Sequence, residues 1–526
     1  MAPKLAYRRG KREGGEEPMS KHQIRSGDGK WTEQRGVGRL NPRRETKIQV
    51  MQVGFAMLEV GSISPKNTKA VLIKNIIDAA LGAICWWTVG HGFAYGKDAG
   101  GFIGTSDFAF ANSDLQFQEE GINFAKWFFH WAFAATAATV VSGAVAERVK
   151  MIAYLQLSFF VTFFIYPAVV HWAWSEGGWA SPFRCRRFTT TEDYRQCLEQ
   201  GRALLLGCGA VDFAGSGVVH MTGGITALIA AAVIQPRTGK FRSDGTINRM
   251  PQQSPALQTL GALILWVGSY GFSGGSVGAV SDGRSALVAA AMVNNTIATA
   301  ASVLSMGLLM RTLHKKFDSG HLNNGIISGL VSINASGPMV RPEGAFIIGS
   351  LASAVYMLGV KGLKRLKIDD VVQASAVHFG CGMWGVISAG LFITKERYRN
   401  MYSDGVYADP DRDDRCCGVF YGCSGRLLGA NLVLMITMGV WVAGLSYLAL
   451  MGIKATVGLR VPINVEERGM DRSRHGRNAK TSGALRRALR ATGADRSTPS
   501  SQRPSLKPSR TGSPRPAAPI LPHWKE

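Results

Sequence analysis

Charged residues are scarce in this sequence. Only 18% of its 526 residues are Asp, Glu, Lys or Arg, whereas about 25% is usual for a soluble domain. The shortage lies in the middle of the chain, because residues 1–46 and 454–526 carry net charges of +6 and +11 and supply +17 of the formal +24. Basic ends beside a membrane are typical of contact with anionic lipid, so we expect no nucleic-acid partner.

Motifs for metal binding and covalent catalysis are also missing. No Cys-x-x-Cys pair and no histidine cluster has the spacing of a zinc or iron–sulfur site. We therefore expect no metal and no cofactor. An enzyme acting inside a membrane would need a nucleophile or a set of metal ligands, and the sequence offers neither, so we expect no enzymatic activity.

The chain is rich instead in apolar runs of about 20 residues, each long enough to cross a bilayer as a helix. These runs lack the separate polar and apolar faces of soluble helices, which argues against a soluble helical protein. The predicted spans are 68–95, 123–147, 151–173, 213–235, 255–274, 284–308, 321–340, 343–362, 370–394 and 424–453. A shorter apolar piece, 48–62, is the candidate eleventh span.

Basic loops predict the orientation of these spans, because short cytoplasmic loops carry an excess of Lys and Arg. The segments 235–249, 310–320 and 361–370 are rich in these residues and alternate with loops that have fewer. We expect these three segments and the C-terminus on the cytoplasmic side. The long loops 174–210 and 395–423 then lie outside.

Six of the eight cysteines lie in or beside the two long loops: Cys185, Cys197, Cys208, Cys416, Cys417 and Cys423. An outside location exposes them to an oxidising compartment, where disulfides form. We therefore expect disulfides there, but the sequence leaves their pairing open.

One pattern occurs twice. "DFAGSGVVH" begins at Asp212 and ends at His220, and "DVVQASAVH" begins at Asp370 and ends at His378. Each aspartate begins a predicted span, and each histidine lies two helical turns deeper. The first span is expected to run inward and the second outward, which is typical of an inverted repeat. The two imidazoles are therefore expected to meet near the middle of the membrane.

Each of these residue types also has a structural explanation. A single histidine in a membrane helix is most often a hydrogen-bonded core residue, but two at matched depth are more typical of a transport pathway. An imidazole also suits a narrow channel, because it donates on one nitrogen and accepts on the other. The aspartates have equal claims to function and to capping free N–H groups at a helix start.

Further motifs resemble those of the ammonium transporters of the Amt/Mep/Rh superfamily, in its plant-like Amt branch. They include "GFAMLEVGSISPKN" (54–67), "WAFAATAATVVSGAVAER" (131–148), "GFSGGS" (271–276), "VNNTIATA" (293–300) and "TVGLRVP…EERGMDRSRHG" (456–476). The resemblance implies an all-α integral membrane protein of eleven transmembrane helices. Helices 1–5 and 6–10 would form two inverted five-helix repeats, followed by a C-terminal helix, with one pore in each subunit of a homotrimer.

The resemblance also implies a role for particular side chains in transporting ammonium or ammonia, with methylammonium as an analogue. Substrate recruitment is assigned to Phe129, Trp174, Ser276 and Asp212; the gate to Phe133 and Phe272; the pore to His220 and His378; and Asp370 is the symmetry-related acid. Aromatic faces attract cations, which offsets part of the cost of moving ammonium out of water.

The C-terminal tail carries a further expectation. "GMDRSRHG" (469–476) is similar to the tail segment that closes the pores of plant ammonium transporters when phosphorylated, and Ser473 is the matching residue. A kinase is thus an expected partner. In the family this tail packs under the neighbouring subunit. The alternative is a plain basic linker.

The expected organisation has four parts. Residues 47–453 form the transmembrane domain, 454–480 a cytoplasmic regulatory tail, and 481–526 a disordered basic tail rich in Pro and Ser. Residues 1–46 are a basic segment, which we interpret as disordered or as the product of an incorrect first exon. Too few apolar residues precede Ile48, so helix 1 is expected to be truncated.

The sequence departs from the family pattern at Ser269, Ser273, Asn334, Val371 and Gln373, where a tryptophan, an asparagine, a threonine, a proline and a second acid are usual. These departures concern the pore entrance and leave the gate and the histidines intact. Two alternative functions are a transporter-like ammonium sensor, which would share every motif, and a Rh-type channel for ammonia or carbon dioxide, which the Amt-like loops and tail disfavour. The expected location is the plasma membrane, in contact with lipid and with a cytoplasmic C-terminus; a plastid membrane is the alternative.

Overall fold

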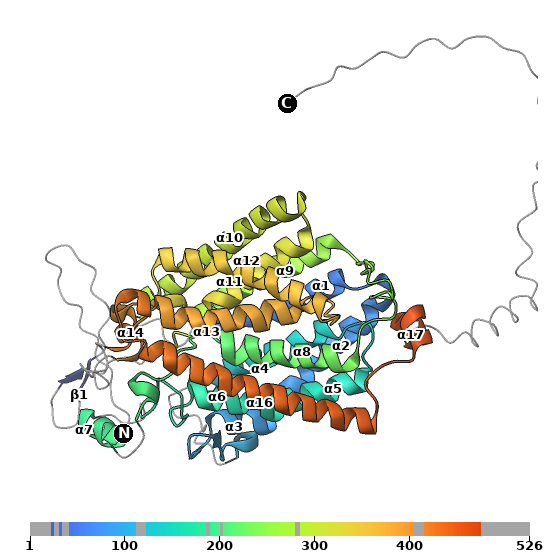
Figure 1. Ribbon diagram of the computed structural model, residues 1–526. Coiled ribbons are helices and arrows are strands. Elements are labelled where there is room, and N and C mark those ends of the chain that lie inside the picture. Colours follow the sequence, from blue (N-terminus) through green and yellow to red (C-terminus); the bar gives the residue numbers. More distant parts are fainter. Residues whose placement is uncertain are drawn as a thin grey trace, which may run out of the picture. The chain divides into compact units, whose positions relative to one another are not determined.

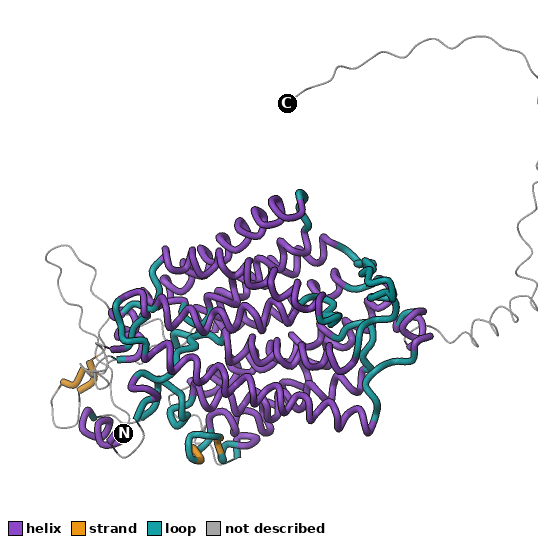
Figure 2. Tube along the Cα trace, viewed as in Figure 1, coloured by secondary structure: helices purple, strands orange, loops and turns teal. Residues whose placement is uncertain are grey.

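The computed structural model describes residues 23–25, 31–33, 42–111, 122–185, 190–199, 203–278, 284–403 and 415–474. Most of these residues are helical (Figures 1 and 2). Two short antiparallel strand pairs accompany the helices: β1 (Gln23–Arg25) with β2 (Trp31–Glu33), and β3 (Asp98–Ala99) with β4 (Ile103–Gly104). The expected disordered tail, 481–526, lies outside the described residues.

Helices occupy every segment predicted to span the membrane. Those of the first half are α1 (Pro42–Ser62), η1 (Pro65–Asn67), α2 (Thr68–Cys85), η2 (Trp86–Gly90), α3 (His91–Tyr95), η3 (Phe108–Phe110), α4 (Ile122–Ala144), α5 (Met151–Phe160), η4 (Val161–Ile165), α6 (Tyr166–Trp174) and α7 (Thr191–Glu199). Helix α1 begins at Pro42 rather than at Ile48 and has 21 residues. Its apolar part, Val50–Ser62, is shorter than a membrane span. The shortage of apolar residues predicted for helix 1 is therefore present, although polar residues continue the helix back to Pro42.

The second half is also mainly helical. Its helices are η5 (Leu205–Gly207), η6 (Ser216–Met221), α8 (Thr222–Ile234), α9 (Pro255–Gly275), α10 (Ser285–His314), α11 (Ser319–Ile333), η7 (Gly337–Met339), α12 (Pro342–Arg365), η8 (Ser375–Gly380), α13 (Cys381–Phe392), α14 (Lys395–Tyr402), η10 (Val419–Tyr421) and α16 (Arg426–Thr456). Two short helices follow in the tail, α17 (Ile463–Arg468) and α18 (Met470–Arg474).

Among the described residues, seven helical stretches are long and apolar enough to cross a membrane. They are Pro65–Tyr95, Met151–Trp174, Ser216–Ile234, Ser285–Leu313, Pro342–Arg365, Ser375–Phe392 and Arg426–Thr456. A shorter apolar helix covers Val50–Ser62. These stretches coincide with predicted spans and indicate an all-α protein that passes through the membrane several times.

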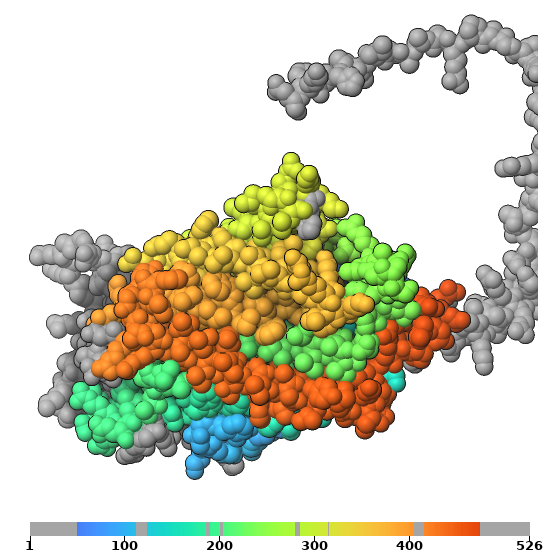
Figure 3. Space-filling view, in the orientation of Figure 1, coloured from blue at the N-terminus to red at the C-terminus, as the bar shows by residue number. Residues whose placement is uncertain are grey.

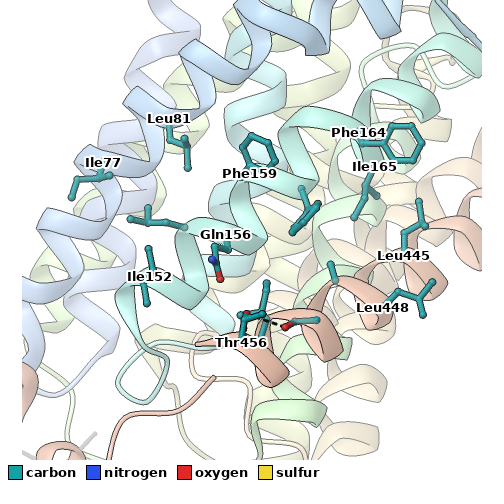
Figure 4. A pocket seen from close by; sticks show the side chains of 15 residues that line it. Ile77, Leu81, Ile152, Gln156, Phe159, Phe164, Ile165, Leu445, Leu448 and Thr456 are labelled. Carbon is teal, nitrogen blue, oxygen red and sulfur yellow. Dashed lines mark hydrogen bonds between the residues drawn. The ribbon is translucent and has the colours of Figure 1, made fainter. Parts of the chain in front are cut away.

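The outer surface of the bundle suits lipid. Large apolar side chains such as Ile76, Leu304 and Val440 are about 70% exposed, and the long helix α16 lies across the face seen in Figure 3. Side chains of α2, α5, η4 and α16 line a groove of about 920 Å³. Gln156 and Thr456 are the polar side chains in this otherwise apolar lining (Figure 4). A soluble protein rarely exposes so much apolar surface.

Glycines let helices α1 and α9 approach closely. A Cβ atom added at Gly61 of α1 would lie 2.3 Å from the backbone nitrogen of Gln258, and one at Gly261 of α9 would lie 2.3 Å from that of Leu58. Small residues at such positions are typical of membrane helices that touch through their backbones. Helices α1 and α9 therefore join the two halves of the chain.

Disulfides mark one end of the bundle, here called the loop end. Cys185 bonds Cys197, Cys208 bonds Cys416, and Cys417 bonds Cys423. The second bond joins the two long loops that the sequence placed on the same side. Helices α7 and α14 lie at this end and α17 lies at the opposite one, the tail end (Figure 1).

A buried ionic cluster at the tail end links four of the segments that connect the helices. The guanidinium of Arg237 donates to Asp369 at 2.7 and 2.9 Å and also to Glu147. Glu147 in turn accepts from the backbone of Ser64 (2.7 Å) and the amide of Asn67 (3.0 Å). Burial by itself raises the pKa of Asp369, but the hydrogen bonds and charge of Arg237 outweigh it and lower the pKa to about 2.

Breaking this cluster should destabilise the protein. Asp369→Asn leaves the buried charge of Arg237 without its main partner, and we expect a loss of about 3 kcal/mol in thermal unfolding of the detergent-solubilised protein. Because the pKa of Asp369 is depressed in the folded state, its contribution is complete above the unfolded pKa near 4 and is lost as pH falls towards 2. Asp244→Asn, in the same loop as Arg237 but exposed, is the control. Equal melting of the two variants would contradict the assignment.

The tail packs against its own chain at this end. Lys66 donates to the carbonyls of Glu466 and Glu467, both at 2.8 Å. The carboxylate of Asp471 accepts from the backbone nitrogens of Lys69 and Ala70, both at 2.9 Å. Asp471 thus caps the N-terminus of α2 from outside that helix, which satisfies free N–H groups and complements the helix dipole.

Candidate functional site

Two phenyl rings close the centre of the bundle. Phe133 from α4 and Phe272 from α9 are fully buried and lie parallel, with ring centroids 3.8 Å apart and planes 9° apart. Because the rings are in contact, a solute can pass between the ends of the bundle along this line only if one of them moves. The two residues predicted to form a gate thus do lie against each other.

The predicted recruitment residues lie on the loop-end side of this pair. Phe129 is 4.6 Å from Phe133, and Trp174 meets Phe133 edge-on at 5.6 Å. Gly275 permits this packing, because a Cβ atom there would lie 2.3 Å from the ring of Phe129. The next residue, Ser276, donates its hydroxyl to the carbonyl of Phe272 at 2.9 Å, which leaves its own lone pairs for another donor.

A second group of rings lies on the loop-end side of the phenyl pair, here called the mouth, and was not predicted from the sequence. The ring of His130 lies 5.9 Å from that of Phe133 and 5.8 Å from that of Trp174, and its nitrogen is 3.0 Å from the hydroxyl of Tyr95. The only signal in the sequence was a histidine inside an apolar run, "FFHWAF". A lone polar residue of this kind resembles an ordinary core histidine.

Asp212 contacts both Trp174 at the mouth and the start of helix η6. Its Oδ2 accepts from the backbone nitrogens of Gly217 (2.9 Å) and Val218 (2.7 Å), and its own carbonyl accepts from the indole of Trp174 at 2.6 Å. The carboxylate is buried, and its Oδ1 has no hydrogen-bond partner among the residues that the structure describes. Asp212 therefore caps a helix and still has one oxygen to spare.

Asp370 has the equivalent capping position before His378. Its two oxygens accept from the backbone nitrogens of Ala374 (3.0 Å) and Ser375 (2.6 Å). Both oxygens are thus engaged, in contrast to those of Asp212. The N-cap interpretation describes the bonds of both aspartates, but only Asp212 has an unpartnered oxygen.

The two histidines lie side by side next to the phenyl pair. His220 is in η6 and His378 in η8, both π-helical turns, a rare geometry that is frequent at functional sites. Their rings are 5.2 Å and 22° apart, and the two Nδ1 atoms are 3.2 Å apart. The ring of Phe272 lies 5.8 Å from that of His220. The two phenyl rings and the two imidazoles therefore form one column.

A small cavity continues the column towards the tail end. Its volume of about 20 Å³ is enough for one water-sized molecule. The lining includes Phe55, Glu59, Thr139, Asn324, Val372 and His378. Phe55, whose ring is 6.1 Å from that of His378, was quoted within a motif but not predicted as a site residue, because a phenylalanine in an apolar run looks like core.

The comparisons with known proteins agree on one family. A sequence model of the Ammonium Transporter Family matches residues 46–480. Ammonium transporter 1 member 2 of Arabidopsis thaliana is 38% identical over 426 residues, covering 79% of this chain and 78% of the relative. Ammonium transporter 1 member 2 of Oryza sativa subsp. japonica is 37% identical over 432 residues, covering 79% and 80%.

Solved structures of similar fold also come from Amt and Mep proteins. A protein described as a sensor Amt protein is 31% identical with a TM-score of 0.69, covering 82% of this chain and 96% of that one. Candida albicans Mep2 is 22% identical with a TM-score of 0.66, covering 80% and 85%, and it supports the fold alone. With the family match over most of its length, the chain belongs to the ammonium transporter family.

Proposed function

We propose that this protein moves ammonium across a membrane through the column of rings, as ammonia past the histidines. The observation that carries the proposal is the stacked pair Phe133 and Phe272 directly beside the paired imidazoles of His220 and His378. In a member of this family, that arrangement fits transport rather than catalysis. No step requires a cofactor or a metal.

The chemistry of each part suits its place. At the mouth, Phe129 and Trp174 offer aromatic faces worth roughly 0.5–2 kcal/mol to a cation. The hydroxyl of Ser276 and the spare oxygen of Asp212 add acceptors for ammonium N–H groups. Beyond the gate a bare cation would cost several kcal/mol or more to hold in apolar surroundings. Neutral ammonia avoids this cost, and the proton travels separately or is added again at the tail end.

The topology proposed is the family's: eleven membrane helices in two inverted repeats plus a last helix, assembled as a homotrimer. The matched aspartate caps and π-helical turns before and around the two histidines support the repeat. The disulfides support an external loop end, and the tail end is then cytoplasmic. The exposed apolar faces contact lipid, in the plasma membrane as the favoured location.

Electrical recording tests the proposal. The protein is expressed in oocytes, and current and labelled methylammonium uptake are measured while ammonium is supplied. Ammonium-dependent uptake that saturates supports transport, and current shows whether net charge crosses. Absence of both, with the protein shown at the cell surface, would contradict transport by this chain.

A sensor is the second candidate function, because the similar structure with 31% identity is described as a sensor Amt protein. A sensor keeps the recruitment residues and can bind ammonium without passing it on. Binding of ammonium to the purified protein, together with absence of uptake and current, would favour this alternative.

We further propose that phosphorylation of Ser473 by a kinase closes the pore. Ser473 is exposed on α18, two residues after Asp471, whose carboxylate caps α2. A phosphate would add a charge of about −1.5 to −2 beside that carboxylate and attract Arg472. Both effects weaken the contact between the tail and the N-terminus of α2.

Substitution at this serine gives a direct prediction. Ser473→Asp should lower methylammonium uptake by roughly 5- to 150-fold, the usual range of coupling between sites, whereas Ser473→Ala should transport normally. If subunits are coupled in a trimer, a minority of Ser473→Asp chains should inhibit co-expressed wild-type chains. Normal uptake by the aspartate variant at equal surface level would show that this segment is a linker.

A further inference from the structure

A row of buried polar side chains leads across the bundle to the histidine pair. In order these are Ser269, Asn295, Ser273, Asn334, His220 and His378. All six are at most 4% exposed. They come from α9, α10, the end of α11, η6 and η8. Such a fully connected network fixes the orientation of its members.

The hydrogen bonds of this row run in one direction. The hydroxyl of Ser269 donates to the carbonyl of Trp266 at 2.6 Å and lies 3.2 Å from the amide oxygen of Asn295. The Asn295 amide nitrogen donates to the oxygen of Ser273 at 2.9 Å. The hydroxyl of Ser273 donates to Oδ1 of Asn334 at 3.2 Å. Nδ2 of Asn334 then faces Nε2 of His220 at 3.1 Å. Asn334 therefore meets His220 with a donor.

The opposite orientation of the Asn334 amide is disfavoured by Ser273. If the amide were turned over, its nitrogen would face Ser273, whose oxygen already accepts from Asn295. The Ser273 hydroxyl would then lose its acceptor. Leaving a buried donor unsatisfied is costly, so Asn295 and Ser273 hold Asn334 in place.

We propose that Asn334 is a positioning residue that sets the proton positions on both histidines. Since Nε2 of His220 accepts from Asn334, neutral His220 carries its proton on Nδ1. That proton is donated to Nδ1 of His378, 3.2 Å away, so neutral His378 carries its own proton on Nε2. The tautomer of each ring follows from the bond made by its other nitrogen.

This arrangement selects against cations during transport, a consequence that rests on the proposed function. The remaining group of the pair is the N–H of His378, which lines the tail-end cavity. Ammonia can accept a hydrogen bond from it through its lone pair. Ammonium has no lone pair and potassium is a bare cation, so neither is stabilised by a donor.

The proton positions can be measured without transport. Wild-type protein labelled with ¹⁵N-histidine in lipid bilayers is compared with labelled His220→Ala and His378→Ala, which assign the signals of the two rings among the ten histidines. We expect a proton on Nδ1 of His220 and on Nε2 of His378. The reverse pattern would overturn the proposal, even if the protein transports ammonium. The expected pattern in a protein without uptake would retain it and reject the proposed function.

Variants of the row then test the link to selectivity. Asn334→Asp replaces the donor with an acceptor and should move a proton to Nε2 of His220. Ser273→Ala frees the Asn334 amide without adding charge and should give mixed tautomers. In each we expect the ratio of ammonium to potassium conductance to fall about fivefold, the effect of one hydrogen bond of about 1 kcal/mol.

Matched controls separate positioning from packing. Asn294→Asp alters an equally buried asparagine that donates to the carbonyls of Gly337 and Val340. Ser446→Ala removes a buried hydroxyl bonded to Thr226. Both should keep the wild-type tautomers and selectivity. Unchanged tautomers in Ser273→Ala and Asn334→Asp, or equal changes in the controls, would overturn the role of Asn334.

Discussion

Alanine in place of His220 or His378 is expected to abolish ammonium transport or to change its selectivity, while the protein still folds and reaches the membrane. Each imidazole donates to or accepts from its neighbour across 3.2 Å inside the buried column. Without one ring, ammonia crosses that step without a hydrogen-bond partner. Losing 1–3 kcal/mol at this point corresponds to roughly 5- to 150-fold in rate.

The measurement is uptake of labelled methylammonium and current under ammonium and potassium, normalised to surface protein. His91→Ala is the control, because His91 is another histidine of the bundle, lies outside the column and has a ring nitrogen, Nδ1, without a partner in the described part of the chain. Unchanged uptake and selectivity in both pore variants would remove the histidines from the transport pathway.

Sequence reasoning located the helices of this protein because apolar runs of about 20 residues are a local signal. It missed the start of α1 at Pro42, where polar residues extend the helix. It also missed the π-helical turns at His220 and His378. An extra residue in a helical turn leaves little trace in composition or periodicity, because packing against other helices decides it.

The site was predictable where a motif repeats and unpredictable where a single residue acts. Asp212, His220 and His378 stood out because one spacing occurs twice. Asn334 was noticed only as a departure from the family pattern, yet it contacts His220 at 3.1 Å. Its role depends on Ser273, which lies 61 positions away in the sequence. Such contacts exist only after the chain has folded.

The pairing of the cysteines was left open for the same reason. Six cysteines allow many pairings, and the bond between Cys208 and Cys416 spans 208 positions. Only the fold brings the two long loops together at one end. The sequence did predict which cysteines would be oxidised, because loop position and membrane orientation are local properties.

Asp212→Ala should eliminate transport, because the carboxylate has two roles at the mouth. Oδ2 caps η6 through Gly217 and Val218, and Oδ1 is buried without a partner among the residues that the structure describes. A buried carboxylate that is only half satisfied is costly, and an arriving cation would offset that cost. Alanine removes both roles, so we expect uptake to fall below detection and stability to fall by about 1–2 kcal/mol, the value of a cap.

Two further substitutions separate the roles. Asp212→Asn keeps an oxygen for the cap but removes the charge, so its stability should stay near wild type while uptake is lost. Asp212→Glu keeps the charge on a longer side chain and should retain part of the uptake. Asp318→Ala removes an ordinary cap, that of α11 through the backbone of His321, and should cost similar stability without loss of transport. Normal uptake by Asp212→Asn would mean that the cap alone matters, and near-normal uptake by Asp212→Ala would make Asp212 an ordinary cap like Asp318.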